Sequence, residues 1–131
     1  MPNQTGVLID TSVWIEFLRG QNQGLIGRIR ELILAREARL CGVVLAELFS
    51  GVKSRSGRDA LREALEAVEY LEVSKDTWAL AGEISSELRG QGIKVPLTDL
   101  VVAALAIKND CELFSFDSQF DHIPNLKRFR I

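Results

Sequence analysis

The stretch "VLIDTSVWIEF", residues 7–17, places a carboxylate at the point where a run of apolar residues ends. The apolar run, residues 7–9, is short and typical of a buried strand. After it, large apolar residues recur at the spacing of one helix face: Trp14, Ile15, Phe17 and Leu18. Asp10 lies at the junction, and two interpretations of it stay open. It begins the helix as a capping residue, or it belongs to a functional site at the end of the strand.

Strand-like and helical segments alternate along the rest of the chain. The predicted strands cover residues 6–10, 38–42, 70–73 and 111–116, with a last one near 127–131. The predicted helices cover roughly 12–18, 24–36, 43–54, 58–70, 76–92 and 99–108, with a helical turn at 118–123. Strands separated by helices imply a parallel sheet covered by helices on both faces. The sequence therefore predicts a three-layer α/β/α sandwich that forms one domain over residues 1–131.

Local signals refine the ends and faces of these helices. Ser56 and Gly57 are predicted to break the chain before the fourth helix, and Thr98 is predicted to be the N-cap of the last long one. That last helix is apolar on nearly all sides, so we expect it to be central. In the helix before it, four residues are predicted to form the apolar face: Trp78, Ala81, Ile84 and Leu88.

The composition is that of an ordinary soluble globular protein. Of 131 residues, 47% are hydrophobic and 26% are charged, and no apolar run approaches the roughly 20 residues of a membrane span. The first residues lack a basic and apolar leader, so we expect a cytoplasmic protein. Cys41 and Cys111 lie far apart without a CxxC motif, which indicates buried thiols and not a zinc site. The net charge of -2 argues against a general nucleic-acid coat but does not exclude a nuclease, because net charge hides local patches.

Four acidic residues occupy positions that strand or helix packing alone would not favour. Asp10 ends the first predicted strand, and Asp117 follows the fourth. Glu47 interrupts an apolar helix, and Asp99 opens the most apolar helix of the chain. Each acid also has a purely structural interpretation: Asp10 as a cap, Asp99 as a charge at a helix N-terminus, Asp117 as a turn residue and Glu47 as an exposed helix position.

Together the four acids point to a metal site. Ligand sites in parallel α/β sheets lie outside the carboxyl ends of the strands, where the strand order reverses. Carboxylates that converge there raise one another's pKa values and lower stability unless a cation neutralises them. Ligands that are all oxygen, without His or Cys, suit Mg²⁺ or Mn²⁺. Such ions hold phosphate oxygens and activate water, which is the chemistry of phosphodiester hydrolysis.

Four segments, in order and nearly end to end, resemble the motifs of PIN-domain ribonucleases, and most of all the VapC toxins of bacterial and archaeal toxin–antitoxin pairs. They are "VLIDTSVWIEFLRG" (7–20), "VVLAELFSGV" (43–52), "VPLTDLVVAALAI" (95–107) and "LFSFDSQFDHIPNL" (113–126). The resemblance implies a PIN-like α/β/α fold with an acidic pocket that binds Mg²⁺ or Mn²⁺. It also implies an RNA substrate, such as a tRNA or another structured RNA, a cognate antitoxin that neutralises the enzyme, and a homodimer.

The resemblance assigns roles by position. The metal ligands and catalytic acids correspond to Asp10, Glu47, Asp99 and Asp117. Ser115, two residues before the fourth acid, helps to hold the site and its water, and Thr11 and Ser12 match the small polar pair after the first acid. The face that carries Trp14 and Phe17 is interpreted as packing, part of which serves the dimer or the antitoxin.

The chain departs from the family pattern at two places. Many relatives carry a further acid two residues after the fourth, where this chain has Gln119, so a full second metal site is in doubt. Asp121 does not fall on that position and is interpreted as a surface acid. Many relatives end in an acidic and aromatic tail, where this chain has "KRFRI" (127–131).

The expected reaction is endoribonucleolytic cleavage by a metal-activated water, with a nearby carboxylate as proton acceptor. His122, the only histidine, lies beside a predicted turn and is interpreted as a surface or packing position. Basic residues near the loops are candidate phosphate contacts, although a solvated position is the simpler interpretation of each one: Arg19, Lys53, Arg55, Arg58 and Lys94.

Two other classes of function compete with the ribonuclease. A catalytically silent PIN-like module that only binds proteins would often have lost one of the four acids. Receiver domains need a paired acid after the first strand and a late lysine, and dehalogenase-type phosphatases need Asp-x-Asp there. This chain has "DTS" (10–12), which fits both poorly.

Overall fold

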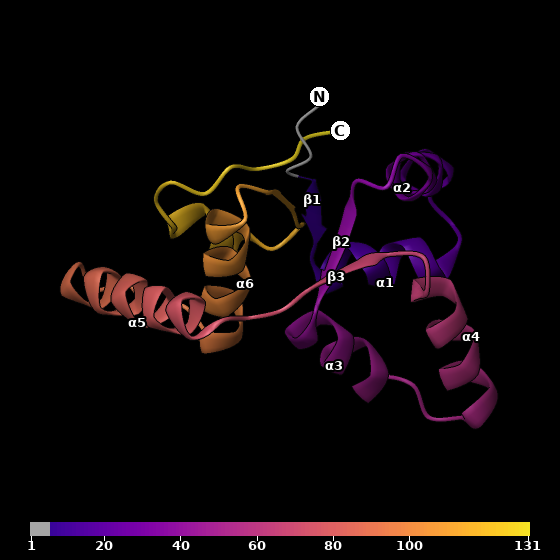
Figure 1. Ribbon diagram of the computed structural model, residues 1–131, viewed down its shortest axis with the longest axis horizontal. Coiled ribbons are helices and arrows are strands. Elements are labelled where there is room, and N and C mark those ends of the chain that lie inside the picture. Colours follow the sequence, from indigo (N-terminus) through magenta and orange to yellow (C-terminus); the bar gives the residue numbers. More distant parts are fainter. Residues whose placement is uncertain (1–5) are drawn as a thin grey trace.

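A four-stranded parallel sheet lies at the centre of the computed structural model, which describes residues 6–131 (Figure 1). The strands are β1 (Val7–Ile9), β2 (Ala38–Cys41), β3 (Glu69–Leu71) and β4 (Glu112–Phe114). Their order in the sheet is β3-β2-β1-β4, and every neighbouring pair is parallel. β1 and β2 are buried along their whole length, as their short apolar runs predict.

Helices connect all of these strands. They are α1 (Thr11–Arg19), α2 (Gln23–Leu34), α3 (Gly42–Ser50), α4 (Arg55–Leu65), α5 (Lys75–Gly90) and α6 (Leu97–Lys108), followed by the 3₁₀ helix η1 (Ser118–His122). Figure 1 shows α5 and α6 on one side of the sheet and α1, α2 and α4 on the other. The expected three-layer α/β/α sandwich with a parallel sheet is therefore confirmed.

The strand order reverses between β1 and β4. From β1 the chain moves outward to β2 and β3, and it then crosses to the opposite side of β1 to form β4. Such a reversal opens a crevice at the carboxyl ends of the two strands, where ligands bind in open α/β sheets. Asp10 directly follows β1, and Asp117 follows β4 within three residues. The topology thus brings the first and fourth acids of the sequence to one edge.

Helix α6 forms the centre of one layer. All seven of its residues from Leu100 to Ala106 are buried. It packs against α5, β4 and α3, which is why it is apolar on nearly every side. Cys41 and Cys111 are both buried, as expected, and neither forms a disulfide within residues 6–131. None of the helices within residues 6–131 is both long enough and apolar enough to cross a membrane.

Two predicted helix starts are wrong, and a neighbouring residue explains each error. α6 begins at Leu97 after Pro96, whose carbonyl accepts the first helical hydrogen bond from the Leu100 N–H at 3.1 Å, so Thr98 lies inside the first turn and is not the N-cap. Ser56 and Gly57 do not break the chain. They lie in the first turn of α4, because the Ser54 hydroxyl accepts from the Gly57 N–H at 3.0 Å and caps that helix.

Two further details differ from the sequence-based expectation. The buried face of α5 contains Thr77, and Trp78 is 50% exposed, because one step along a helix rotates a side chain by about 100°. The segment near residues 127–131 does not form a fifth strand within residues 6–131. It makes one isolated parallel bridge, between Leu113 and Arg128.

The burial of α6 predicts a contrast between two leucines on the same helix. Leu105 is fully buried, whereas Leu97 is 61% exposed. Leu105→Ala leaves a cavity, so we expect it to lower the free energy of unfolding by about 2–5 kcal/mol, whereas Leu97→Ala changes it by no more than about 0.5 kcal/mol. Urea unfolding of the two variants measures the difference. Equal losses would contradict the central position of α6.

Candidate active site

Asp10 occupies the N-cap position of α1, but its side chain does not cap the helix. Its backbone carbonyl accepts from the N–H groups of Val13 and Trp14 at 3.1 and 3.2 Å. The carboxylate turns toward β4 instead, and its Oδ2 accepts from the hydroxyls of Ser12 at 3.0 Å and Ser115 at 2.8 Å. Asp10 therefore begins α1 through its backbone, while its carboxylate bonds to Ser12 and to the loop after β4. The residue is only 6% exposed.

A network of hydroxyl groups joins the loops that follow β1 and β4. The Ser12 hydroxyl accepts from the Phe116 N–H at 3.1 Å and lies 3.3 Å from the Ser115 hydroxyl. Ser115 Oγ in turn accepts from the Asp117 N–H at 3.0 Å. Asp117 Oδ1 accepts from the Gln119 N–H at 2.9 Å and caps η1. Asp117 therefore has the turn-forming contact that the structural interpretation predicted, in a loop that is bonded to Asp10 through Ser115.

Glu47 reaches the same edge from α3. Thr11 Oγ1 donates to Glu47 Oε1 at 2.6 Å, which ties this carboxylate to the residue next to Asp10. The alternative of an isolated, solvated helix position is therefore too simple for Glu47, although the residue is exposed. Thr11 and Ser115, the two supporting residues that the family resemblance suggested, each hold one of the four acids.

Asp99 lies in the first turn of α6, and the other three acids act on it electrostatically. Partial burial raises its pKa first, and the charges of Asp117, Asp10 and Glu47 raise it further, to about 6 from an ordinary value of 3.8. Because a carboxylate feels other charges strongly only at short range, the four acids share one electrostatic field. Four elements that are distant in sequence thus bring the four predicted acids close enough for three of them to act electrostatically on Asp99.

The chemistry of these side chains fits a hard divalent cation. All of the donors are carboxylate oxygens. None of the ion pairs formed within residues 6–131 involves any of the four acids, so no lysine or arginine neutralises them. As the side chains are placed, however, no three acidic, histidine or cysteine residues in this part of the chain are close enough to hold a metal ion together. The four acids therefore match a divalent cation in donor type and in charge, but their side chains are not arranged to coordinate one together.

Arg128 is a site-supporting residue that the sequence did not suggest. One guanidinium nitrogen donates to the Ser115 carbonyl at 3.1 Å, and another donates to Asp121 at 2.8 Å. The C-terminal segment therefore holds the loop that carries Ser115 and Asp117. Asp121 is on the surface, as expected, but it is the ion-pair partner of Arg128. His122 is exposed in η1.

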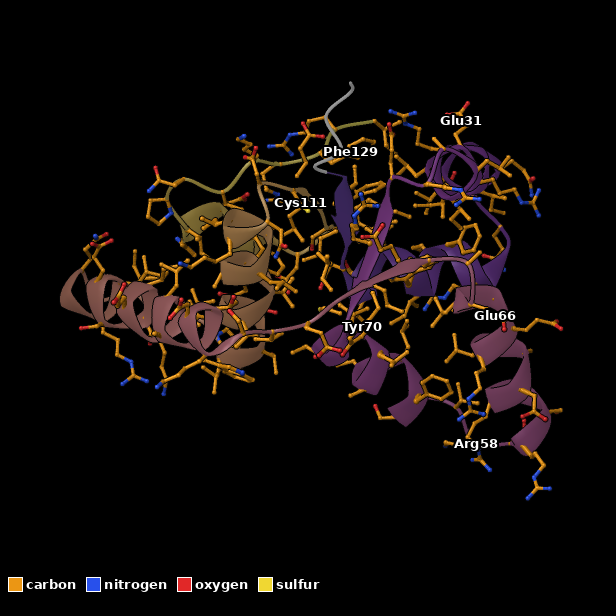
Figure 2. All side chains as sticks on the ribbon, viewed as in Figure 1. Glu31, Arg58, Glu66, Tyr70, Cys111 and Phe129 are labelled. Atoms are coloured by element: carbon orange, nitrogen blue, oxygen red, sulfur yellow. The ribbon has the colours of Figure 1, made fainter. Side chains whose placement is uncertain are left out.

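The basic residues singled out in the sequence lie on exposed surfaces. Arg19 pairs with Glu16 on α1 at 3.1 Å. Lys53 and Arg55 are exposed at the turn before α4 and at its first residue. Arg58 is exposed on α4, near the lower end of this helix in Figure 2. Lys94 is exposed in the connection before α6.

An apolar groove of about 490 Å³ adjoins the acidic crevice and lies between α1, α3 and α4. Its walls include Ile15 and Leu18 of α1, which are partly exposed although they share a helix with the buried Trp14. Glu47 and Arg19 also line it. The predicted apolar face of α1 is thus divided, with one part in the core and another part in an open groove.

Comparison with known protein families identifies the class of this fold and site. The PIN domain matches residues 7–126, which is nearly the whole chain. The chain therefore belongs to the PIN-domain family, and the resemblance suggested by its four motifs is confirmed.

Individual relatives narrow the comparison to VapC proteins. The chain is 27% identical to ribonuclease VapC11 of Mycobacterium tuberculosis over 124 residues, which cover 92% of each protein. It is 25% identical to ribonuclease VapC2 of Rickettsia felis, over 91% of this chain and 92% of that protein. Among solved structures, VapBC2 of Rickettsia felis bound to a promoter DNA fragment aligns with a TM-score of 0.83 and 22% identity, covering 94% and 96% of the two chains. VapC20 of Mycobacterium tuberculosis, described as a sarcin-ricin loop cleaving toxin, aligns with a TM-score of 0.68 and 19% identity, covering 96% and 100%.

The raised pKa of Asp99 predicts a pH-dependent cost of folding in the absence of metal ions. Between about pH 4 and pH 6 the folded state binds more protons than the unfolded state, so stability falls as the pH rises through this window. Asp99→Asn cannot ionise and does not carry this cost. In EDTA we expect the variant to melt roughly 2–5 °C above the parent at pH 7.5, with a smaller gap at pH 4.5.

Asp59→Asn is the matched control for this measurement. Asp59 is an exposed acid on α4 whose partner is Arg62 at 3.8 Å, so its substitution is not expected to raise the melting temperature at pH 7.5. An Asp99→Asn variant that melts at or below the parent temperature at pH 7.5 would show that ionised Asp99 does not lower the stability of the fold.

Proposed function

We propose that this chain is a single-domain, cytoplasmic VapC-type toxin, a Mg²⁺- or Mn²⁺-dependent endoribonuclease that a cognate antitoxin neutralises. The proposal is carried by the arrangement of the four acids around the reversal of the sheet. Ser115 joins Asp10 to the loop of Asp117, Thr11 holds Glu47, and these three acids act electrostatically on Asp99. Within residues 6–131, no salt bridge pairs any of the four with a base. Membership of the PIN-domain family supports it, as does similarity over nearly the whole chain to proteins named as VapC ribonucleases.

In this proposal the four acids hold the cation, which when bound neutralises phosphate charge and activates a water for attack on phosphorus. The residues of the chain keep the carboxylates oriented. Ser12 and Ser115 fix Asp10, Thr11 fixes Glu47, and the Gln119 N–H fixes Asp117. A carboxylate at this edge accepts the proton of the attacking water. Gln119 stands where many relatives have a fifth acid, so the proposal includes no full second metal site.

An RNA strand that approaches four acidic side chains is repelled by them, so basic residues nearby are needed to bind its phosphates. Arg19, Lys53, Arg55 and Arg58 are exposed on α1 and around the start of α4, the two helices that flank the groove beside Glu47. We propose that they contact phosphates and guide the RNA strand toward the acids. The RNA class proposed is a tRNA or another structured RNA.

The apolar groove between α1, α3 and α4 is the proposed place for the antitoxin. Ile15 and Leu18 offer partly exposed apolar surface beside Glu47, so a partner segment seated there would also cover the acidic edge. One similar solved structure is described as a toxin–antitoxin complex from Klebsiella pneumoniae, and another, VapBC-5 of Mycobacterium tuberculosis, as a member of the VapBC family of toxin–antitoxin systems, which supports a partner of this kind. A homodimer is proposed as the assembled form.

A silent protein-binding module is the alternative function, and cleavage separates the two. With Mn²⁺ and total RNA, we expect the parent chain to cut RNA at defined positions, and Asp99→Asn to reduce the rate at least about 100-fold without unfolding. Primer extension maps the cut sites. Asp59→Asn is the control and is expected to cut at the parent rate.

The comparison is decisive in either direction. Metal-dependent cutting by the parent and by Asp59→Asn, but not by Asp99→Asn, supports the proposed reaction. An Asp99→Asn variant that retains the parent rate, or a parent that cuts no RNA under these conditions, would favour the silent module.

The proposed phosphate contacts predict a change in salt dependence. Each lost contact with a single strand reduces the slope of log K against log salt by about 0.7, so Lys53→Glu with Arg55→Glu weakens RNA binding most at low salt. Filter binding of an uncleaved RNA to Asp99→Asn, with and without these changes, measures the slope. Lys108→Glu, at the C-terminal end of α6, is the control. An unchanged slope would remove Lys53 and Arg55 from the RNA path.

A further inference from the structure

Phe116 is a partly exposed aromatic residue in the loop that also carries Ser115 and Asp117. It lies between Ser115, which bonds Asp10, and Asp117, and its side chain is 52% exposed. Its contact with Phe114 leaves about half of the residue exposed, so the ring has surface available for a ligand. We propose that Phe116 is a stacking surface for an unpaired RNA base, and that it positions the strand at the acids. The inference rests on the proposed ribonuclease function.

The ring is held in place before any ligand binds. It meets the buried Phe114 ring in a T-shaped contact, with centroids 5.7 Å apart and an interplanar angle of 83°. The Phe116 backbone N–H donates to the Ser12 hydroxyl at 3.1 Å. Arg128 holds the neighbouring Ser115 carbonyl at 3.1 Å. Because the backbone and one side of the ring are already fixed, a base that stacks on the open side loses little additional side-chain entropy.

The charge of the site favours a base face as the ligand. The chain has a formal net charge of -2, so apart from the proposed cation and basic residues its surface gives the RNA backbone little electrostatic attraction. Stacking on an aromatic ring does not depend on charge, and every base offers a π-face. Bases within a duplex have both faces covered by their neighbours, so the ring selects nucleotides that are unpaired or turned outward.

The experiment compares Phe116→Leu with Phe116→Tyr in the full-length protein. Leucine keeps apolar packing on Phe114 but has no π-face, and tyrosine keeps the ring. The substrate is an oligoribonucleotide that spans a cut site mapped in total RNA. In Mn²⁺ we expect Phe116→Leu to raise KM roughly 5- to 100-fold with kcat within about twofold. Phe116→Tyr is expected to have the same KM as the parent.

A second substrate tests stacking directly. Single abasic sites are placed in turn at the nucleotides around the cut. At the stacked position, the abasic substrate raises KM for the parent as much as Phe116→Leu does, and the two changes together add no further loss. A merely structural role of Phe116 would give additive losses at every position.

Phe129→Ala is the matched control. Phe129, labelled in Figure 2, packs against the same Phe114 ring, with centroids 4.8 Å apart. It lines a hollow with Gly6, Val7 and Glu112 at the amino ends of β1 and β4. We expect this variant to lose stability and to keep the parent KM.

The outcomes distinguish a failure of the ribonuclease function from a failure of the stacking role of Phe116. A parent that cuts no RNA overturns the proposed function and this inference with it. Two results would overturn only the role of Phe116 while the parent cuts RNA. In one, Phe116→Leu has the same KM as the parent. In the other, Phe116→Leu raises KM by the same factor on the substrate that is abasic at the stacked position as on the intact substrate.

Discussion

The parallel pairing of β1 with β4 is the constraint on which the site depends. These strands are more than 100 residues apart, with Val7, Leu8 and Ile9 in register with Glu112, Leu113 and Phe114. Their carboxyl ends carry Asp10 and the Ser115–Asp117 loop, so this register alone places the first and fourth acids together. The Asp10 N–H donates to the Phe114 carbonyl at 2.9 Å, which continues the pairing to the edge of the site. A shift by one residue would turn Asp10 to the other face of the sheet.

The four acids around the carboxyl ends of β1 and β4 repel one another, and this repulsion lowers the stability of the fold. Serine and threonine hydroxyls orient Asp10 and Glu47 without neutralising them, and the pKa of Asp99 is raised to about 6. A cluster designed only for stability would carry a lysine or arginine among the acids, as the pair of Asp121 and Arg128 does nearby. The unneutralised charge accords with the proposed function, in which a divalent cation would occupy this edge.

The sequence predicted the features that depend on local pattern. Buried strands and apolar helices have recognisable periods, and a carboxylate after a strand lies at the carboxyl edge of a parallel sheet wherever that strand is placed. The errors arose where one residue or one distant contact decides the outcome. Pro96 moved the start of α6 ahead of Thr98, and a single helical step exchanged Thr77 for Trp78 on the buried face. Arg128 could not be assigned from sequence, because its partners Ser115 and Asp121 become neighbours only through tertiary folding.

Calorimetric titration with Mn²⁺ tests the central claim, that the four acids form one site for a divalent cation, most directly. A cation that binds there must displace the proton whose binding to Asp99 is favoured first by burial and then by the neighbouring acids. In buffers of different ionisation enthalpy, the account predicts release of about half a proton per site at pH 6, where Asp99 is half protonated, and almost none at pH 8. Asp99→Asn should abolish the difference between the two pH values. Binding without proton release at pH 6, or no saturable binding, would contradict the account.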